Sequence, residues 1–156
     1  MKRDVKLTEG SKKARKSAAR LAAVQVLYQI HHQELDAKTA LSEYKTHRLG
    51  YKLEDDLYVP ADQDLLTDIV LGYDERKTDI QDMVKASLQD KDPEQIDKLL
   101  LNILYAGAFE ILTHHDIDAG IIIADYMNVT DAFFDQSEKK LVNAILDRLN
   151  KNLRAS

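Results

Sequence analysis

The sequence predicts an all-α protein, a bundle of six to seven helices. Apolar residues recur every three to four positions in one segment after another, which is the spacing of a buried helix face. No segment shows convincing strand character, and the connections are short apart from one. The length of 156 residues fits one domain. We place this domain at residues 11–153, after a flexible basic segment at residues 1–10.

The first predicted helix runs from Ser11, as its N-cap, to about residue 32, and its two halves differ in character. The first half is basic, and its cations share one face at intervals of four residues: Lys12, Lys16 and Arg20, with Lys13 beside them. The second half carries the predicted buried stripe of Leu21, Val24 and Tyr28. One helix is therefore expected to anchor itself by its second half and to expose a row of cations from its first.

A short second helix is predicted over residues 35–44, followed by a loop at residues 46–63. A loop of this length is either functional or a tolerated surface excursion. Residues 64–88 return to helical spacing. Gly72 lies inside this segment and indicates either a break in the helix or a close contact with a neighbouring one.

Residues 98–112 are apolar nearly all round, which predicts a helix at the centre of the bundle. Pro93 ends the preceding segment, and Asp97 is the expected N-cap. Gly107, between two alanines, favours close packing of another helix. Glu110 is expected at the polar edge of the bundle.

The last two helices are predicted at residues 119–133 and 137–153. The turn at residues 114–116 precedes the first of them, and Asp118 is its expected N-cap. The start of the last helix is less firmly set, because Ser137 and Lys140 do not form a capping box.

Positive charge is concentrated at the N-terminus. Residues 1–20 hold eight Lys or Arg against two acidic residues, a net charge of +6, whereas the whole chain carries −5. The remainder therefore carries −11, so that a cationic arm precedes an acidic body. This distribution indicates either a localised site for a polyanion or a solubilising tail without a ligand.

The residues that support catalysis are scarce. The chain has no cysteine, which excludes a disulfide framework, a thiol nucleophile and a cysteine-ligated zinc. Its five glycines are scattered, so no phosphate-cradling loop occurs. Adjacent histidines on a helix point about 100° apart and do not face one metal ion. We therefore expect no enzyme, no cofactor and no metal site. Without a membrane-length apolar run or a secretory signal, a cytoplasmic location is expected.

Three segments share their order and spacing with a known family. They are A-A-R-L-A-A-V-Q-V-L-Y-Q at residues 18–29, I-D-K-L-L-L-N-I-L-Y-A-G-A-F-E-I-L at 96–112, and I-I-I-A-D-Y-M-N-V-T-D-A-F-F at 121–134, which leads into K-L-V-N-A-I-L-D-R-L at 140–149. Together they resemble the NusB family of bacterial transcription antitermination factors. The resemblance implies two three-helix subdomains and no catalysis. It also implies binding of boxA RNA together with the ribosomal protein NusE. Further partners would be other Nus factors and RNA polymerase, with read-through of terminators notably in ribosomal RNA operons.

The resemblance also implies site residues. The RNA-binding candidates, from the basic helix and the region around the last one, are Lys12, Lys13, Lys16, Arg20, Phe133 and Lys140. Tyr28 is implied at the surface for the partner protein. Ser17 stands where the family often has an arginine, which weakens RNA contact unless neighbouring cations compensate. Leu100, Leu101 and Tyr105 replace charged residues frequent in the family, so charge-based partner contacts there do not carry over.

The chemistry of the residues agrees, because single-stranded RNA is held by cations along its backbone and by aromatic rings stacked on its bases. Each candidate also has a structural interpretation: core packing for Phe133 and Tyr28, and an ordinary surface cation for Arg20. Two other functions stay open. One is a NusB-like accessory domain of an RNA methyltransferase, which requires that this chain be a fragment. The other is a protein-only adaptor with a passive basic tail.

Overall fold

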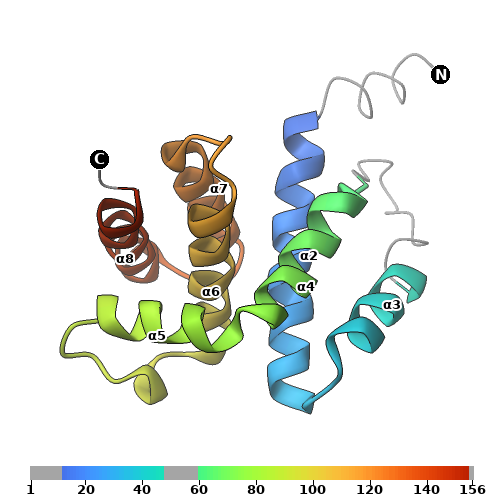
Figure 1. The fold of residues 1–156 in the computed structure, drawn as a ribbon, viewed down its shortest axis with the longest axis horizontal. Helices are drawn as coiled ribbons and strands as arrows, with labels where there is room; N and C mark the ends of the chain where they lie inside the picture. The colour runs from blue at the N-terminus through green and yellow to red at the C-terminus, as the bar shows by residue number, and fades with distance from the viewer. Residues whose placement is uncertain (1–11, 48–59, 155–156) are drawn as a thin grey trace. The chain divides into compact units, whose positions relative to one another are not determined.

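The structure is a computed structural model that describes residues 12–47 and 60–154, and every regular element in these ranges is a helix (Figure 1). The predicted all-α class is therefore confirmed. The chain is divided into two compact units, one that ends at Leu71 and one that begins at Gly72. The predicted flexible segment at residues 1–10, the N-cap at Ser11 and most of the long loop lie outside the described residues.

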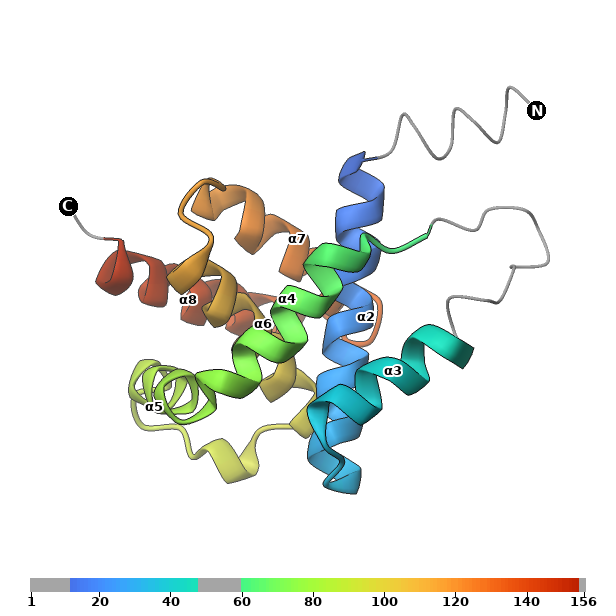
Figure 2. The same cartoon turned by 45° about the vertical axis from the view of Figure 1, so that its right-hand side comes forward.

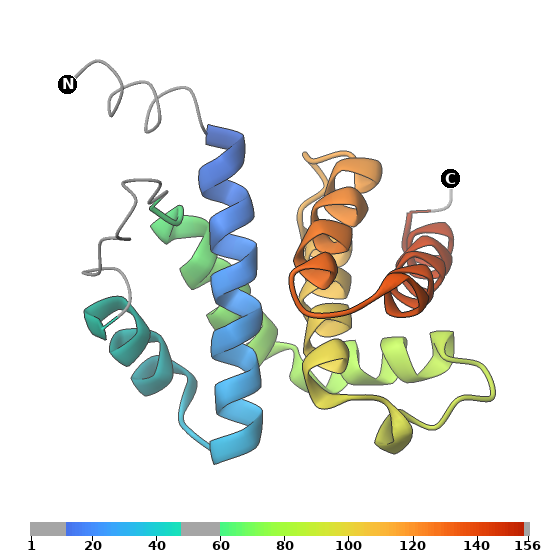
Figure 3. The same cartoon turned by 180° about the vertical axis from the view of Figure 1, so that it is seen from behind.

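The first unit is built on a long helix, α2 (Lys12–Gln33), which α3 (Ala37–His47) follows after a tight turn. Glu34 adopts a left-handed conformation at this turn, with φ of 53°, and the N–H of Leu35 reaches back to the carbonyl of Ile30. This arrangement closes the end of α2 in the manner of a Schellman motif. As a result α3 turns back beside the C-terminal part of α2 (Figures 2 and 3).

The buried face of α2 differs from the predicted stripe. Val24 is buried as expected, but Leu21 and Tyr28 are only half-buried, so this part of the prediction is wrong. The buried residues of the helix are Ala19, Arg20, Ala22, Ala23, Val24, Val26 and Leu27. The three alanines let neighbouring atoms approach the backbone closely. Val24, Val26 and Leu27 are buried beside them, so the buried face combines small and larger side chains.

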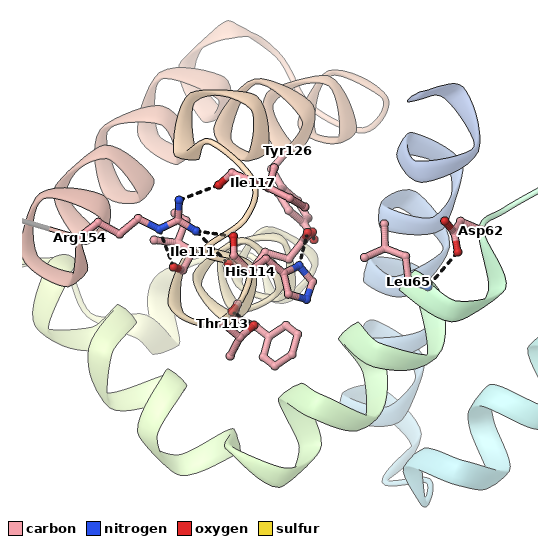
Figure 4. A network of polar contacts seen from close by, with 10 residues as sticks. Asp62, Leu65, Ile111, Thr113, His114, Ile117, Tyr126 and Arg154 are labelled. Carbon is pink, nitrogen blue, oxygen red and sulfur yellow. Dashed lines mark hydrogen bonds and ion pairs between the residues drawn. The ribbon is translucent and has the colours of Figure 1, made fainter. Parts of the chain in front are cut away.

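The start of α4 (Gln63–Glu75) is tied to α2 through Asp62. The Asp62 carboxylate accepts a hydrogen bond from the backbone N–H of Leu65 at 3.0 Å and caps the helix (Figure 4). The backbone N–H of Asp62 donates to the carbonyl of Arg15 at 3.0 Å. A second tie joins α3 to α4, because Lys45 Nζ donates to Thr67 Oγ1 at 2.7 Å. The basic half of α2 is thus held by the body of its own unit.

The segment of predicted helical spacing at residues 64–88 forms two helices, α4 and α5 (Lys77–Ser87), with the break at Arg76. Gly72 is not the break. A Cβ placed on Gly72 would lie 2.4 Å from Cζ of Phe109, so the glycine allows the aromatic ring to lie against the backbone. The close contact predicted as the alternative is therefore the correct one. The second unit consequently contains four α-helices in its described residues.

The centre of the second unit is α6 (Lys98–Thr113), which is buried without interruption from Leu100 to Ile111. Asp97 caps it as predicted, accepting from the N–H of Leu99 at 2.8 Å. A Cβ on Gly107 would meet the methyl groups of Leu146 at 3.0 Å, which confirms the predicted close packing.

Helix α6 packs mainly against α5, α7 (Ala119–Asp131) and α8 (Gln136–Leu153) (Figure 1). Asp118 caps α7 as predicted, accepting from the N–H of Gly120. The start of α8 is better defined than expected, because Asp135 and Glu138 form a capping box and the helix begins at Gln136, one residue before the predicted start. A short 3-10 helix, Pro93–Gln95, precedes α6.

The prediction that Glu110 lies at the edge of the bundle is wrong. Its side chain is fully buried on α6. One carboxylate oxygen accepts from the Tyr126 hydroxyl at 2.5 Å, and the other lies 2.9 Å from Nδ1 of His114. A carboxylate is stable in a protein interior only when its oxygens are bonded, and these two partners supply the bonds.

The end of α6 is closed by an arginine from beyond α8. The guanidinium of Arg154 donates to the carbonyls of Ile111 (2.9 Å), Ile117 (2.8 Å) and His114 (2.8 Å), and more weakly to that of Glu110 (3.4 Å) (Figure 4). The last carbonyls of a helix have no intrahelical partner, and a cation at that end also complements the helix dipole.

We predict that Arg154→Ala lowers the free energy of unfolding by about 2 kcal/mol, because several carbonyls lose a charged donor. Chemical denaturation monitored by circular dichroism measures the change. Lys151→Ala is the matched control, since it removes only an ion pair between exposed side chains, and it should change stability by less than about 0.5 kcal/mol. Equal stabilities for the two variants would contradict this role of Arg154.

Candidate nucleic-acid interface

The first two turns of α2 present three lysines to solvent. Lys12, Lys13 and Lys16 are all exposed, and within residues 12–47 and 60–154 none of them forms an ion pair. Lys12 and Lys16 are one turn apart and share a face. The first turn of α2 contains no acidic residue, so the positive end of the helix dipole adds to the lysine charges. This end of α2 therefore attracts anions.

Arg15 supports this surface from within. Its side chain is half-buried, and its backbone carbonyl is the acceptor for Asp62 described above. Nε of Arg15 is buried and, in the described part of the chain, has no hydrogen-bond partner. Arg15 therefore adds a further cation to the first two turns of α2.

Arg20 does not continue the exposed row. Only 3% of its surface is accessible, and it makes an interaction within the protein. The expectation that it shares an exposed face with Lys12 and Lys16 is therefore wrong. Its neighbours Ala19, Ala22 and Ala23 leave room for its aliphatic part beside the helix, and long cationic side chains commonly bury such stems. Contact between Arg20 and RNA stays a prediction that requires its side chain to leave this position.

Tyr28 lies on the same helix, three turns after Lys16, and is half-buried. Its ring stacks on the imidazole of the exposed His32, with centroids 5.8 Å apart and the planes 13° from parallel. The pair forms a flat, partly exposed aromatic surface. The sequence-based reading did not include His32, although its spacing of four residues from Tyr28 is the signal for such a pair.

The candidates in the second unit are also accessible. Phe133 follows the end of α7 and is 38% exposed, so it is not a core residue alone. Its backbone N–H donates to the carbonyl of Thr130 at 3.0 Å, which fixes the chain there. Lys140 is exposed on the second turn of α8, whereas its neighbour Lys139 is paired with Asp131 at 3.3 Å. An accessible ring and an unpaired ammonium are groups that bind bases and phosphates.

The described residues offer little else for chemistry. Nowhere in them do three or more His, Asp or Glu side chains gather as metal ligands. Within the same ranges, no helix is both long enough and apolar enough to cross a membrane. The surface features described above are those of a binding protein: exposed lysines, two accessible aromatic groups and a rigid helical support.

The comparisons with known proteins agree on one family. Residues 17–151 match the sequence model of the NusB family. The transcription antitermination protein NusB of Novosphingobium aromaticivorans is 40% identical over 149 residues, which cover 95% of this chain and 100% of the relative. The protein of the same name from Sinorhizobium medicae is 41% identical, over 89% of this chain and 88% of its own length.

A solved structure has the same fold. The structure of T. maritima NusB superposes with a TM-score of 0.70 and covers 87% of this chain and 90% of its own. The sequence identity is 22%, so this likeness bears on the fold alone.

We predict that Arg20 and Lys16 differ in what they contribute to folding. Arg20→Ala should lower the free energy of unfolding by about 1–3 kcal/mol, because it removes a buried side chain together with its interaction. Lys16→Ala should change it by less than about 0.5 kcal/mol, since Lys16 is exposed and unpaired in the described residues. Urea denaturation of both variants provides the measurement. A destabilised Lys16→Ala beside an unchanged Arg20→Ala would refute this division.

Proposed function

Because this chain belongs to the NusB family of transcription antitermination proteins, we propose that it binds single-stranded boxA-type RNA together with the ribosomal protein NusE. The complex would then join other Nus factors on RNA polymerase and suppress premature termination, notably in ribosomal RNA operons. The role is one of binding rather than catalysis, and it places the protein in the cytoplasm with the polymerase. The observation that carries the proposal is the row of exposed lysines on the anchored helix α2, none of which forms an ion pair within residues 12–47 and 60–154.

The lysines suit the backbone of a single strand. Each neutralised phosphate releases counterions, which favours binding at low salt and makes affinity fall as salt rises. The cations stand on a helix whose middle is buried, and the backbone N–H of Asp62 donates to the carbonyl of Arg15. Little conformational freedom of the backbone is therefore lost when RNA binds.

Base recognition is assigned to the second unit. Phe133 offers a partly exposed ring for stacking, and stacking on an aromatic side chain contributes about 1–3 kcal/mol per base. Lys140 is exposed and able to hold a neighbouring phosphate. We assign Tyr28 to the surface for NusE, and its stacked partner His32 extends that surface.

Two alternatives are less well supported. The relatives named above are antitermination proteins that match over 88–100% of their own length, which favours that role over the accessory domain of a methyltransferase. A protein-only adaptor would have no need of the lysines of α2, which are exposed and have no carboxylate partner within the described residues. It remains the outcome to expect if the complex binds NusE but no RNA.

We predict a log–log dependence of affinity on salt with a slope of roughly −2 to −3.5, for about three to five phosphates held on a single strand. The measurement is a titration of the protein with NusE against boxA-type RNA at several salt concentrations. Replacing Lys12 and Lys16 together by Gln should make the slope shallower by about 1.4, since two phosphate contacts are lost.

The matched control replaces Lys85 and Lys98 by Gln, which removes the same charge from exposed positions of the second unit. It should leave the slope nearly unchanged. A slope near zero for the unmodified protein, or the same loss in both double variants, would argue against RNA binding by α2.

A further inference from the structure

A shallow pocket of about 380 Å³ lies on α3, in the first unit. Its lining is Lys38, Leu41, Ser42, Lys45 and Thr46. These residues follow one another at three, four and seven positions, so they form one face of the helix. Leu41 is buried, whereas the other four carry hydroxyl or ammonium groups. The pocket therefore presents hydrogen-bond donors and two positive charges around an apolar base.

The two ammonium groups of this pocket have no carboxylate partner in the described part of the chain. Lys38 is exposed and forms no ion pair there. Lys45 Nζ donates to the neutral hydroxyl of Thr67, which leaves two of its three protons available. Glu43, on the same helix, points about 140° away from Lys38 and so lies on another face. An anion is the ligand that satisfies this arrangement.

Within the first unit, the N-terminal part of α4 links the pocket to the basic half of α2. Asp62, at the start of α4, is bonded to the carbonyl of Arg15, and Thr67, five residues further on, is bonded to Lys45. Asp62 and Thr67 are about 7.5 Å apart along the axis of α4, which is the separation of these two attachment points and not of the lysines themselves. A bound strand can bridge such a distance with a few nucleotides, since one nucleotide rises roughly 3.4 Å along a stacked strand.

We propose that the α3 pocket is a second contact for the phosphate backbone of the RNA, and that it holds nucleotides flanking the boxA-type element. Lys38 and Lys45 neutralise the phosphate charge, and the hydroxyls of Ser42 and Thr46 donate to its oxygens. The proposal rests on the RNA-binding function proposed above. Under this proposal the first unit binds RNA through two helices, α2 and α3. Its affinity for the RNA therefore depends on how many nucleotides flank the boxA-type element.

The test compares boxA-type RNA with the same RNA extended by a few nucleotides on either side. The unmodified full-length protein and the double variant Lys38→Gln plus Lys45→Gln are each titrated, together with NusE, against both RNAs at several salt concentrations. The variant should lose roughly three- to tenfold in affinity for an extended RNA, with a slope shallower by about 1.4. It should bind the short RNA as the unmodified protein does.

Two further variants separate RNA contact from effects on folding. Thr67→Val removes the hydrogen bond of Lys45 but keeps its charge, and it should retain full affinity for the extended RNA. The double variant Lys85→Gln plus Lys98→Gln removes the same charge from the second unit, and it should also retain full affinity for the extended RNA. If Thr67→Val alone reproduces the loss, the pocket acts through the fold and the inference is overturned.

The outcomes distinguish this inference from the function on which it rests. If the Lys38 and Lys45 variant binds every RNA normally while the Lys12 and Lys16 variant loses affinity, the pocket is not an RNA contact, and the proposed function stands. If the unmodified protein with NusE binds none of these RNAs, both proposals fail. Protection of Lys38 from acetylation by the extended RNA, but not by the short one, supports the inference independently.

Discussion

A helix buried along almost its whole length must have its polar groups bonded inside the protein, and α6 is such a helix. Its one carboxylate, on Glu110, is bonded by Tyr126 of α7 and by His114 after its own end. Its last carbonyls are bonded by Arg154, which follows α8. These bonds require α7 and the end of α8 to hold fixed positions around α6. The segment between α7 and α8 is therefore held at both ends, and this segment carries the accessible ring of Phe133.

In the first unit, the basic end of α2 is held in place by contacts that do not neutralise its lysines. Burial of alanines and valines anchors the middle of α2, and Asp62 adds a backbone bond at Arg15 without placing its carboxylate on a lysine. The exposed lysines thus keep their charge available to an outside partner. Ordering them in advance lowers the entropic cost of binding. Fold and function are linked here through rigidity rather than through a pocket for a small molecule.

The sequence was sufficient for features that depend on local chemistry. The caps at Asp97 and Asp118 and the close packing at Gly107 were all predicted from residue type and spacing. It was insufficient where the partner lies far along the chain. Glu110 looked like an edge residue because its bonding partner Tyr126 lies sixteen residues on, and Arg20 looked exposed because helical spacing does not show which face neighbouring segments cover. The site residues follow the same division, since the exposed lysines on α2 were predictable from their spacing and the burial of Arg20 was not.

Ultraviolet crosslinking of boxA-type RNA to the protein with NusE, followed by mass spectrometry of the crosslinked peptides, tests the central claim most directly. The claim is that an anchored α2 presents its lysines to the RNA while the ring of Phe133 stacks on a base. The account predicts crosslinked peptides from the start of α2 and from the segment that contains Phe133. Crosslinks confined to other surfaces, such as the exposed face of α5, would contradict it.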